Sequence, residues 1–165
     1  MTDKVVKIGN LYDDFEVGQV FRHHWGRTIT ETDNTLYTTL TMHFNPLYFN
    51  REYAERFGHK NVVINPMLVF HTVLGISVED LSEAGRGPFL GVDDVRFLRP
   101  VYPGDTLYAA SKVIDKRESN SRPEFGIVTW DTVGLRSDGD EVIRLTRRNL
   151  ISKTLREPTH LRKEK

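Results

Sequence analysis

The segment from residue 65 to residue 81 constrains the fold of this chain more than any other. It opens with Asn65, which can cap a helix, and Pro66, which suits the first helical position because the missing N–H costs nothing there. A helix that is apolar all round is normally buried on every side. The pattern therefore predicts a central buried helix over residues 66–81, with apolar side chains on nearly every face at Met67, Leu68, Val69, Phe70, Val73, Leu74, Ile76, Val78 and Leu81.

Strand-like segments follow this helix and continue to residue 152. Asp138-Gly139 is a favoured hairpin turn, so the last two strands should be antiparallel neighbours. A buried helix followed by antiparallel strands predicts a single α+β domain in which the sheet wraps around the helix. From their content of β-forming residues and the turn sequences between them, we expect strands over 89–98, 105–117, 125–136 and 141–152.

Caps and breakers define the elements before the central helix. Thr30 and Asn50 are both suited to the N-cap of a helix, and Asn45-Pro46 interrupts regular structure between them. We expect, in order, a strand over 19–29, a helix over 31–40, a loop over 44–49 and a short helix over 51–56.

Charge and composition narrow the classes of partner. The 165 residues suffice for one domain, and 23 basic side chains balance 23 acidic ones, so there is no bulk electrostatic case for nucleic acid or an anionic membrane. No apolar run approaches the ~20 residues of a membrane span, and the first residues lack the apolar core of a signal peptide. We therefore expect a cytoplasmic protein without a nucleic-acid or membrane partner.

Metal and cofactor sites are not expected either. The absence of cysteine excludes disulfides and cysteine–metal sites. His23 and His24 are adjacent on a predicted strand, where successive side chains point to opposite faces, so they cannot bind one metal from the same side.

The stretch Met42–Ala54 resembles the signature of the MaoC-like hydratase/dehydratase family. In that family the signature reads Gly-Asp-x-Asn-Pro-x-His, followed by an acidic residue and a Tyr-Ala pair. Here Asn45 and Pro46 match, as does the Tyr-Ala pair at 53–54, but His43 stands at the aspartate position and Tyr48 at the histidine position.

Further segments extend this resemblance over most of the chain. Asp14–Gln19 and Val95–Leu107 resemble two other conserved segments of the family. The resemblance implies a hot-dog domain over residues 15–153, an N-terminal extension over 1–14 and a basic tail over 154–165. A nearer likeness, to the branch around mesaconyl-CoA and methylmalyl-CoA hydratases, is carried by Leu40–Met42, Leu74–Leu81, Glu118–Pro123 and Gly126–Val128.

The resemblance implies hydration or dehydration of an enoyl or 3-hydroxyacyl thioester carried by CoA or a carrier protein. In this interpretation His43 is the general base, since imidazole can accept a proton near neutral pH. Tyr48 would be an acid or hydrogen-bond donor, with Asn45 assisting. The family polarises the thioester with backbone N–H groups at the start of the central helix, where Pro66 has none, so Asn65 or the N–H of Met67 would substitute.

Two more residues are candidates for contact with the substrate. His71 shares a helix face with Met67 at i, i+4 and would line the acyl pocket, although a histidine on an apolar face is commonly a packing residue. Arg122 follows the family's Ser-Arg-Pro segment and would hold pantetheine or an acyl carboxylate, with an exposed turn arginine as the alternative.

Three interpretations remain open for the loop that carries His43 and Tyr48. It is a variant acid–base site of a hydro-lyase, the site of a tailoring dehydration or cyclisation in secondary metabolism, or a degenerate site on a non-catalytic partner that binds a thioester. Hot-dog domains commonly pair through their sheets, so we expect a homodimer or an oligomer built from dimers.

Overall fold

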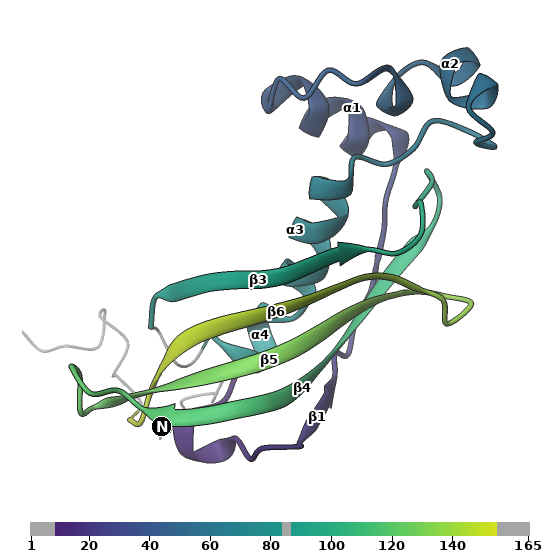
Figure 1. Ribbon diagram of the computed structural model, residues 1–165. Coiled ribbons are helices and arrows are strands. Elements are labelled where there is room, and N and C mark those ends of the chain that lie inside the picture. Colours follow the sequence, from purple (N-terminus) through teal and green to yellow (C-terminus); the bar gives the residue numbers. More distant parts are fainter. Residues whose placement is uncertain (1–8, 84–86, 155–165) are drawn as a thin grey trace, which may run out of the picture.

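The computed structural model describes residues 9–83 and 87–154, and these form one antiparallel sheet with helices on one side (Figure 1). The six described strands follow the order β1-β4-β5-β6-β3, and β2 also pairs with β4. The elements are η1 Tyr12–Asp14, β1 Val20–Arg22, β2 Arg27–Thr28, α1 Glu31–Leu40, η2 Pro46–Tyr48, α2 Arg51–Arg56, α3 Pro66–Ile76, α4 Val78–Leu81, β3 Phe89–Phe97, β4 Thr106–Glu118, β5 Phe125–Arg136 and β6 Glu141–Ser152.

The α+β class, the helix α1 and the four long strands agree with the sequence prediction, and the strand ends differ from it by at most one residue. Both predicted caps are confirmed. The Thr30 side chain accepts from the Asp33 N–H and the Asp33 carboxylate accepts from the Thr30 N–H, which completes a capping box, while Asn50 caps α2.

Helix α3 lies across one face of the sheet (Figure 1). Its buried residues Val69, Phe70, Val73 and Ile76 pack against side chains of β4 and β6. The contact is close at Gly134 of β5, where a Cβ atom would lie 2.5 Å from a methyl group of Val73. Burial of each such aliphatic or aromatic side chain contributes ~1.5–3 kcal/mol, which fixes the helix on the sheet.

The prediction of one helix buried on every side is wrong in two respects. The helix breaks at Ser77, whose hydroxyl donates to the Leu74 carbonyl 2.7 Å away, and α4 follows as a separate short helix. The face that carries Met67, His71 and Gly75 is exposed, because a single sheet covers only the opposite side of α3.

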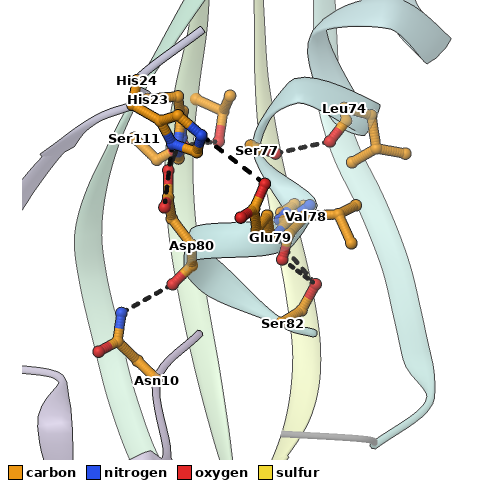
Figure 2. A network of polar contacts seen from close by, with 12 residues as sticks. Asn10, His23, His24, Leu74, Ser77, Val78, Glu79, Asp80, Ser82 and Ser111 are labelled. Atoms are coloured by element: carbon orange, nitrogen blue, oxygen red, sulfur yellow. Dashed lines mark hydrogen bonds and ion pairs between the residues drawn. The ribbon is translucent and has the colours of Figure 1, made fainter. Parts of the chain in front are cut away.

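The predicted strand over 19–29 is also interrupted: the His23 N–H still donates to the Ala109 carbonyl of β4 at 3.1 Å, and the chain then leaves the sheet ladder until β2 begins at Arg27. There the buried His23 ring lies between Asp80 of α4, 2.7 Å from Nδ1, and the Ser111 hydroxyl of β4, 3.0 Å from Nε2. Figure 2 shows Asp80 facing both His23 and His24. Through these two contacts His23 links α4 to the sheet.

Helices α1, η2 and α2 form an overhang, residues 31–56, which projects beyond the sheet at the N-terminal end of α3 (Figure 1). The overhang and its flanks expose large apolar side chains at Leu36, Leu40, Met42, Phe44, Phe49 and Phe57.

A second core cluster lies at the opposite end of the molecule, around Phe15, Leu81 and Trp130. Tyr12, which lies in the predicted N-terminal extension, also belongs to this cluster. Residues 1–8 of the predicted extension and residues 155–165 of the predicted basic tail lie outside the described residues.

Candidate functional site

The overhang meets the start of α3 at Asn65, a fully buried residue that contacts both parts. Its Oδ1 accepts from the Met67 N–H at 3.0 Å and so caps the helix. Its Nδ2 lies 3.1 Å from Nδ1 of His43, in the segment that follows α1. The backbone N–H of His43 donates to the Thr38 carbonyl, which folds this segment back toward α3. The structure thus brings together two residues predicted for the site.

This contact sets the proton positions on His43. Because the Met67 N–H fixes Oδ1 of Asn65, the group that faces His43 is the amide NH2, which can only donate. Nδ1 of His43 must then be the acceptor, and a neutral imidazole with that acceptor carries its proton on Nε2. In this arrangement the Nδ1 lone pair of His43 is engaged by Asn65, and its Nε2–H is able to donate a hydrogen bond.

Tyr48 lies beside His43, with ring centroids 5.3 Å apart and planes at 80°. Its side chain is buried, and burial raises the pKa of Tyr48 above its ordinary value. The phenol therefore stays protonated at neutral pH and is a second donor. Asn45 caps η2 by accepting from the Leu47 N–H at 3.1 Å, so the asparagine of the signature shapes the loop that carries Tyr48.

Asn34 of α1 organises this region, although sequence reasoning missed it. It is fully buried, and its Nδ2 donates to the carbonyls of Tyr48 at 2.7 Å and Val63 at 3.1 Å. Its Oδ1 accepts from the Asn65 N–H at 2.7 Å. The available signal was the spacing of Asn34 and Thr38 at i, i+4, which places both on one face of α1, and both are buried.

The start of α3 offers no ready backbone donor for a thioester oxygen. Pro66 lacks an N–H, and the N–H groups of Met67 and Leu68 are bound to the side chain and the carbonyl of Asn65. Substitution by the Met67 N–H, one of the two predicted replacements, would require breaking the helix cap. The side chains of His43 and Tyr48 remain as donors.

A cleft of about 490 Å³ lies along the exposed face of α3, between the overhang and the residues that precede β2. Within it, Nδ1 of His71 lies 3.0 Å from the hydroxyl of Tyr37 of α1. His71 is therefore a cleft residue rather than a core residue. The lining consists of Trp25, Gly26, Arg27, Tyr37, Leu68, His71, Thr72, Gly75 and Ile76.

The remaining predicted residue, Arg122, is not brought to this region. It lies in the turn between β4 and β5, where its N–H donates to the Ser119 hydroxyl at 3.2 Å. The adjoining strand residue Gly126 packs on Tyr12, at the end of the molecule opposite the overhang.

No group of three or more metal-binding side chains lies together among the residues that the structure describes. Within residues 9–83 and 87–154, no helix is long and apolar enough to cross a membrane.

Comparison with known proteins identifies relatives of this chain. The family model for mesaconyl-CoA hydratase matches residues 2–162. A mesaconyl-CoA hydratase of Haloarcula hispanica is 36% identical over 151 residues, which cover 91% of this chain and 41% of that protein. The chain therefore spans about two fifths of the length of this curated relative.

Two solved structures are similar to this one. A protein assigned as a MaoC domain dehydratase, from Chloroflexus aurantiacus, superimposes with a TM-score of 0.82 at 35% identity, over 92% of this chain and 44% of that one. A Mycobacterium tuberculosis protein described as a double hot-dog fold superimposes with a TM-score of 0.77 at 22% identity, over 88% and 45%. These matches confirm the predicted hot-dog fold and the resemblance to the MaoC-like family.

Proposed function

The chain belongs to the mesaconyl-CoA hydratase family, and on that premise we propose that it is a hydro-lyase of acyl thioesters. The reaction adds water across the 2,3-double bond of an enoyl thioester or removes it from a 3-hydroxyacyl thioester, on CoA or a carrier protein. The single observation that carries the proposal is the polar cluster of His43, Tyr48 and Asn65, which occupies the family's signature loop and the start of the central helix.

The cluster is suited to stabilising negative charge on a thioester oxygen. Attack of water at C3 moves the π electrons of the double bond toward the thioester and builds an enolate-like oxygen. Nε2–H of His43 and the hydroxyl of Tyr48 are neutral donors held by the surrounding packing, and Asn65 fixes the proton of His43 on Nε2. Removing one donor of this kind typically costs ~2.7–4 kcal/mol of transition-state stabilisation.

We also propose that the active protein is a homodimer joined along β3. This strand is an edge of the described sheet and exposes the large side chains Phe89, Leu90, Val95 and Phe97. An exposed apolar edge invites pairing with another strand. The similar proteins are more than twice as long as the segment that matches this chain, and one of them has two hot-dog units. We therefore propose a second copy of this chain as the partner that pairs with β3.

A panel of enoyl and 3-hydroxyacyl thioesters, including branched dicarboxylic ones and both CoA and carrier-protein forms, tests the proposed reaction by mass spectrometry. We expect gain or loss of one water, with kcat lowered ~10²–10³-fold in His43→Ala and unchanged in His59→Ala, a histidine that contacts Tyr102 and does not line the cleft.

Saturable binding of these thioesters without turnover would contradict the proposal and favour a non-catalytic thioester-binding protein. Full turnover by His43→Ala would leave the reaction in place and overturn the role of His43.

A further inference from the structure

The polar cluster supplies donors, but hydration also needs a group that takes a proton from water. His43 has its Nδ1 lone pair engaged, and Tyr48 is a protonated phenol. We propose that His71, positioned by Tyr37, is the general acid–base residue of this protein. This inference rests on the proposed function and adds to it a catalytic residue in a different place from the signature loop.

The contact between Tyr37 and His71 suits this role. The hydroxyl of Tyr37 lies 3.0 Å from Nδ1 of His71. If Nδ1–H donates to the tyrosine oxygen, Nε2 carries a lone pair that is free to take a proton. Burial raises the pKa of Tyr37, so the phenol remains neutral and does not itself become the base. In this tautomer Tyr37 is a positioning residue, which holds the ring of His71 through Nδ1 and leaves Nε2 free.

The other polar side chains of the cleft are not suited to act as a base. Arg27 is a cation, and its guanidinium is 2.7 Å from the Asp33 carboxylate. Hydrogen bonds from Thr30 lower the pKa of Asp33, and this carboxylate is committed to capping α1. Thr72 bears a hydroxyl, which is not basic near neutral pH. Among the lining residues that the structure describes, His71 alone can both accept and donate a proton near neutral pH.

His43 and Tyr37 each join the α1 region to α3, and we place the thioester between these two contacts. His43 contacts Asn65 at the N-terminus of α3, and Tyr37 contacts His71 six positions farther along the helix. At 1.5 Å per residue the two contacts are ~9 Å apart along the axis.

The surface between these contacts is apolar and accessible. Met67 shares a face with His71 at i, i+4 and is 38% exposed. Leu68 lines the cleft next to it. An acyl chain that lies over Met67 would present its thioester oxygen to His43 and Tyr48 and its second and third carbons to His71.

The proposed step conserves atoms and charge. Nε2 of His71 takes one proton from water while the water oxygen bonds to C3, and the π electrons move onto the thioester oxygen beside His43. The imidazolium then returns that proton to C2, the thioester carbonyl re-forms, and one molecule of water has been added. Because one imidazole serves both carbons from one side, the addition is syn.

Two variants and two matched controls test this assignment. His59 and Tyr102 form a pair with the same connectivity, with Nδ1 3.1 Å from the tyrosine hydroxyl, and they line none of the described clefts. We expect His71→Gln to lower kcat ~10²–10⁴-fold with little change in KM. Tyr37→Phe should lower kcat roughly 5- to 30-fold, while His59→Gln and Tyr102→Phe should match the wild type.

Two further readouts separate chemistry from a structural effect. In wild-type protein kcat/KM should fall on the acidic side as the base is protonated, and His71→Gln should lose this limb. In D2O the wild-type protein should place one deuterium at C2, syn to the new hydroxyl, and the residual turnover of His71→Gln should lose this facial preference.

If His71→Gln keeps the kcat of the wild type, the inference about His71 is wrong, and the proposed reaction is unaffected. An effect of equal size in His71→Gln and His59→Gln would likewise overturn it, as would anti addition. Absence of wild-type turnover on every thioester would overturn the proposed function and this inference together.

Discussion

At the scale of single residues, two buried asparagines hold the candidate site together. Asn34 bonds three backbone groups that belong to η2, to the segment before α3 and to Asn65. Asn65 in turn bonds the Met67 N–H and the ring of His43. Because all of these contacts except the cap of Asn65 on Met67 join segments far apart in the sequence, their consequence for the proton positions on His43 could not be predicted from the chain alone.

Replacement of Asn34 by Ala should strongly destabilise the protein. It leaves the carbonyls of Tyr48 and Val63 and the N–H of Asn65 without their partner, and each unsatisfied buried group costs ~1–3 kcal/mol. We expect a loss of roughly 3 kcal/mol in urea unfolding, allowing for partial hydration of the opened site. Asn50→Ala, which removes only an exposed helix cap, should cost ~1 kcal/mol. Equal losses in the two variants would contradict the role given to Asn34.

At the scale of elements, the sequence predicted what depends on local patterns. The content of β-forming residues and the turns between them predicted the four long strands, and Thr30 and Asn50 predicted the starts of α1 and α2. The errors fall where tertiary contacts decide. The strand over 19–29 is interrupted after His23, whose ring contacts α4, and α3 keeps an exposed face because the single sheet covers only its opposite side.

The contact between α4 and the sheet makes the fold sensitive to acid (Figure 2). Burial lowers the pKa of His23 below 6.5, against the opposing hydrogen bond and charge of Asp80, and the charges of Arg147 and His24 act in the same direction as burial. The unfolded chain therefore takes up a proton first as the pH falls, so this contribution to stability is present above about pH 6.5 and is lost as the pH falls toward the folded pKa.

Urea unfolding between pH 7.5 and 5 measures this effect. The free energy of unfolding should fall below pH 6.5 with a slope of at most about 1.4 kcal/mol per pH unit from this histidine. His23→Gln should be less stable at pH 7.5 and have a shallower slope. His59→Gln, in which a histidine away from α4 is removed, should retain the wild-type slope. An unchanged slope in His23→Gln would contradict the assignment.

At the scale of the whole molecule, the exposed edge of β3 predicts the oligomeric state. Sedimentation velocity should give twice the mass of the chain. Val95→Lys places a charge at a side chain that is 38% exposed on β3, and desolvating that charge at the interface should shift the protein toward the monomer. Val20→Lys is the matched control, because Val20 is 55% exposed on β1 at the opposite edge, and this variant should remain a dimer.

A monomeric wild-type protein would overturn the proposed interface. So would a dimer that persists in Val95→Lys and dissociates in Val20→Lys. The second result would move the interface to β1.

We propose that the hydrogen-bond donors to the thioester oxygen and the general base are different residues. The tautomer of His43 tests this separation most directly. Nitrogen-15 NMR of histidine-labelled protein at neutral pH reports which ring nitrogen carries the proton, with His43→Gln to assign the signal. The hydrogen bond from Asn65 predicts a bare Nδ1 and a protonated Nε2. A protonated Nδ1 with a bare Nε2 would contradict it, because His43 would then be the free base of the site.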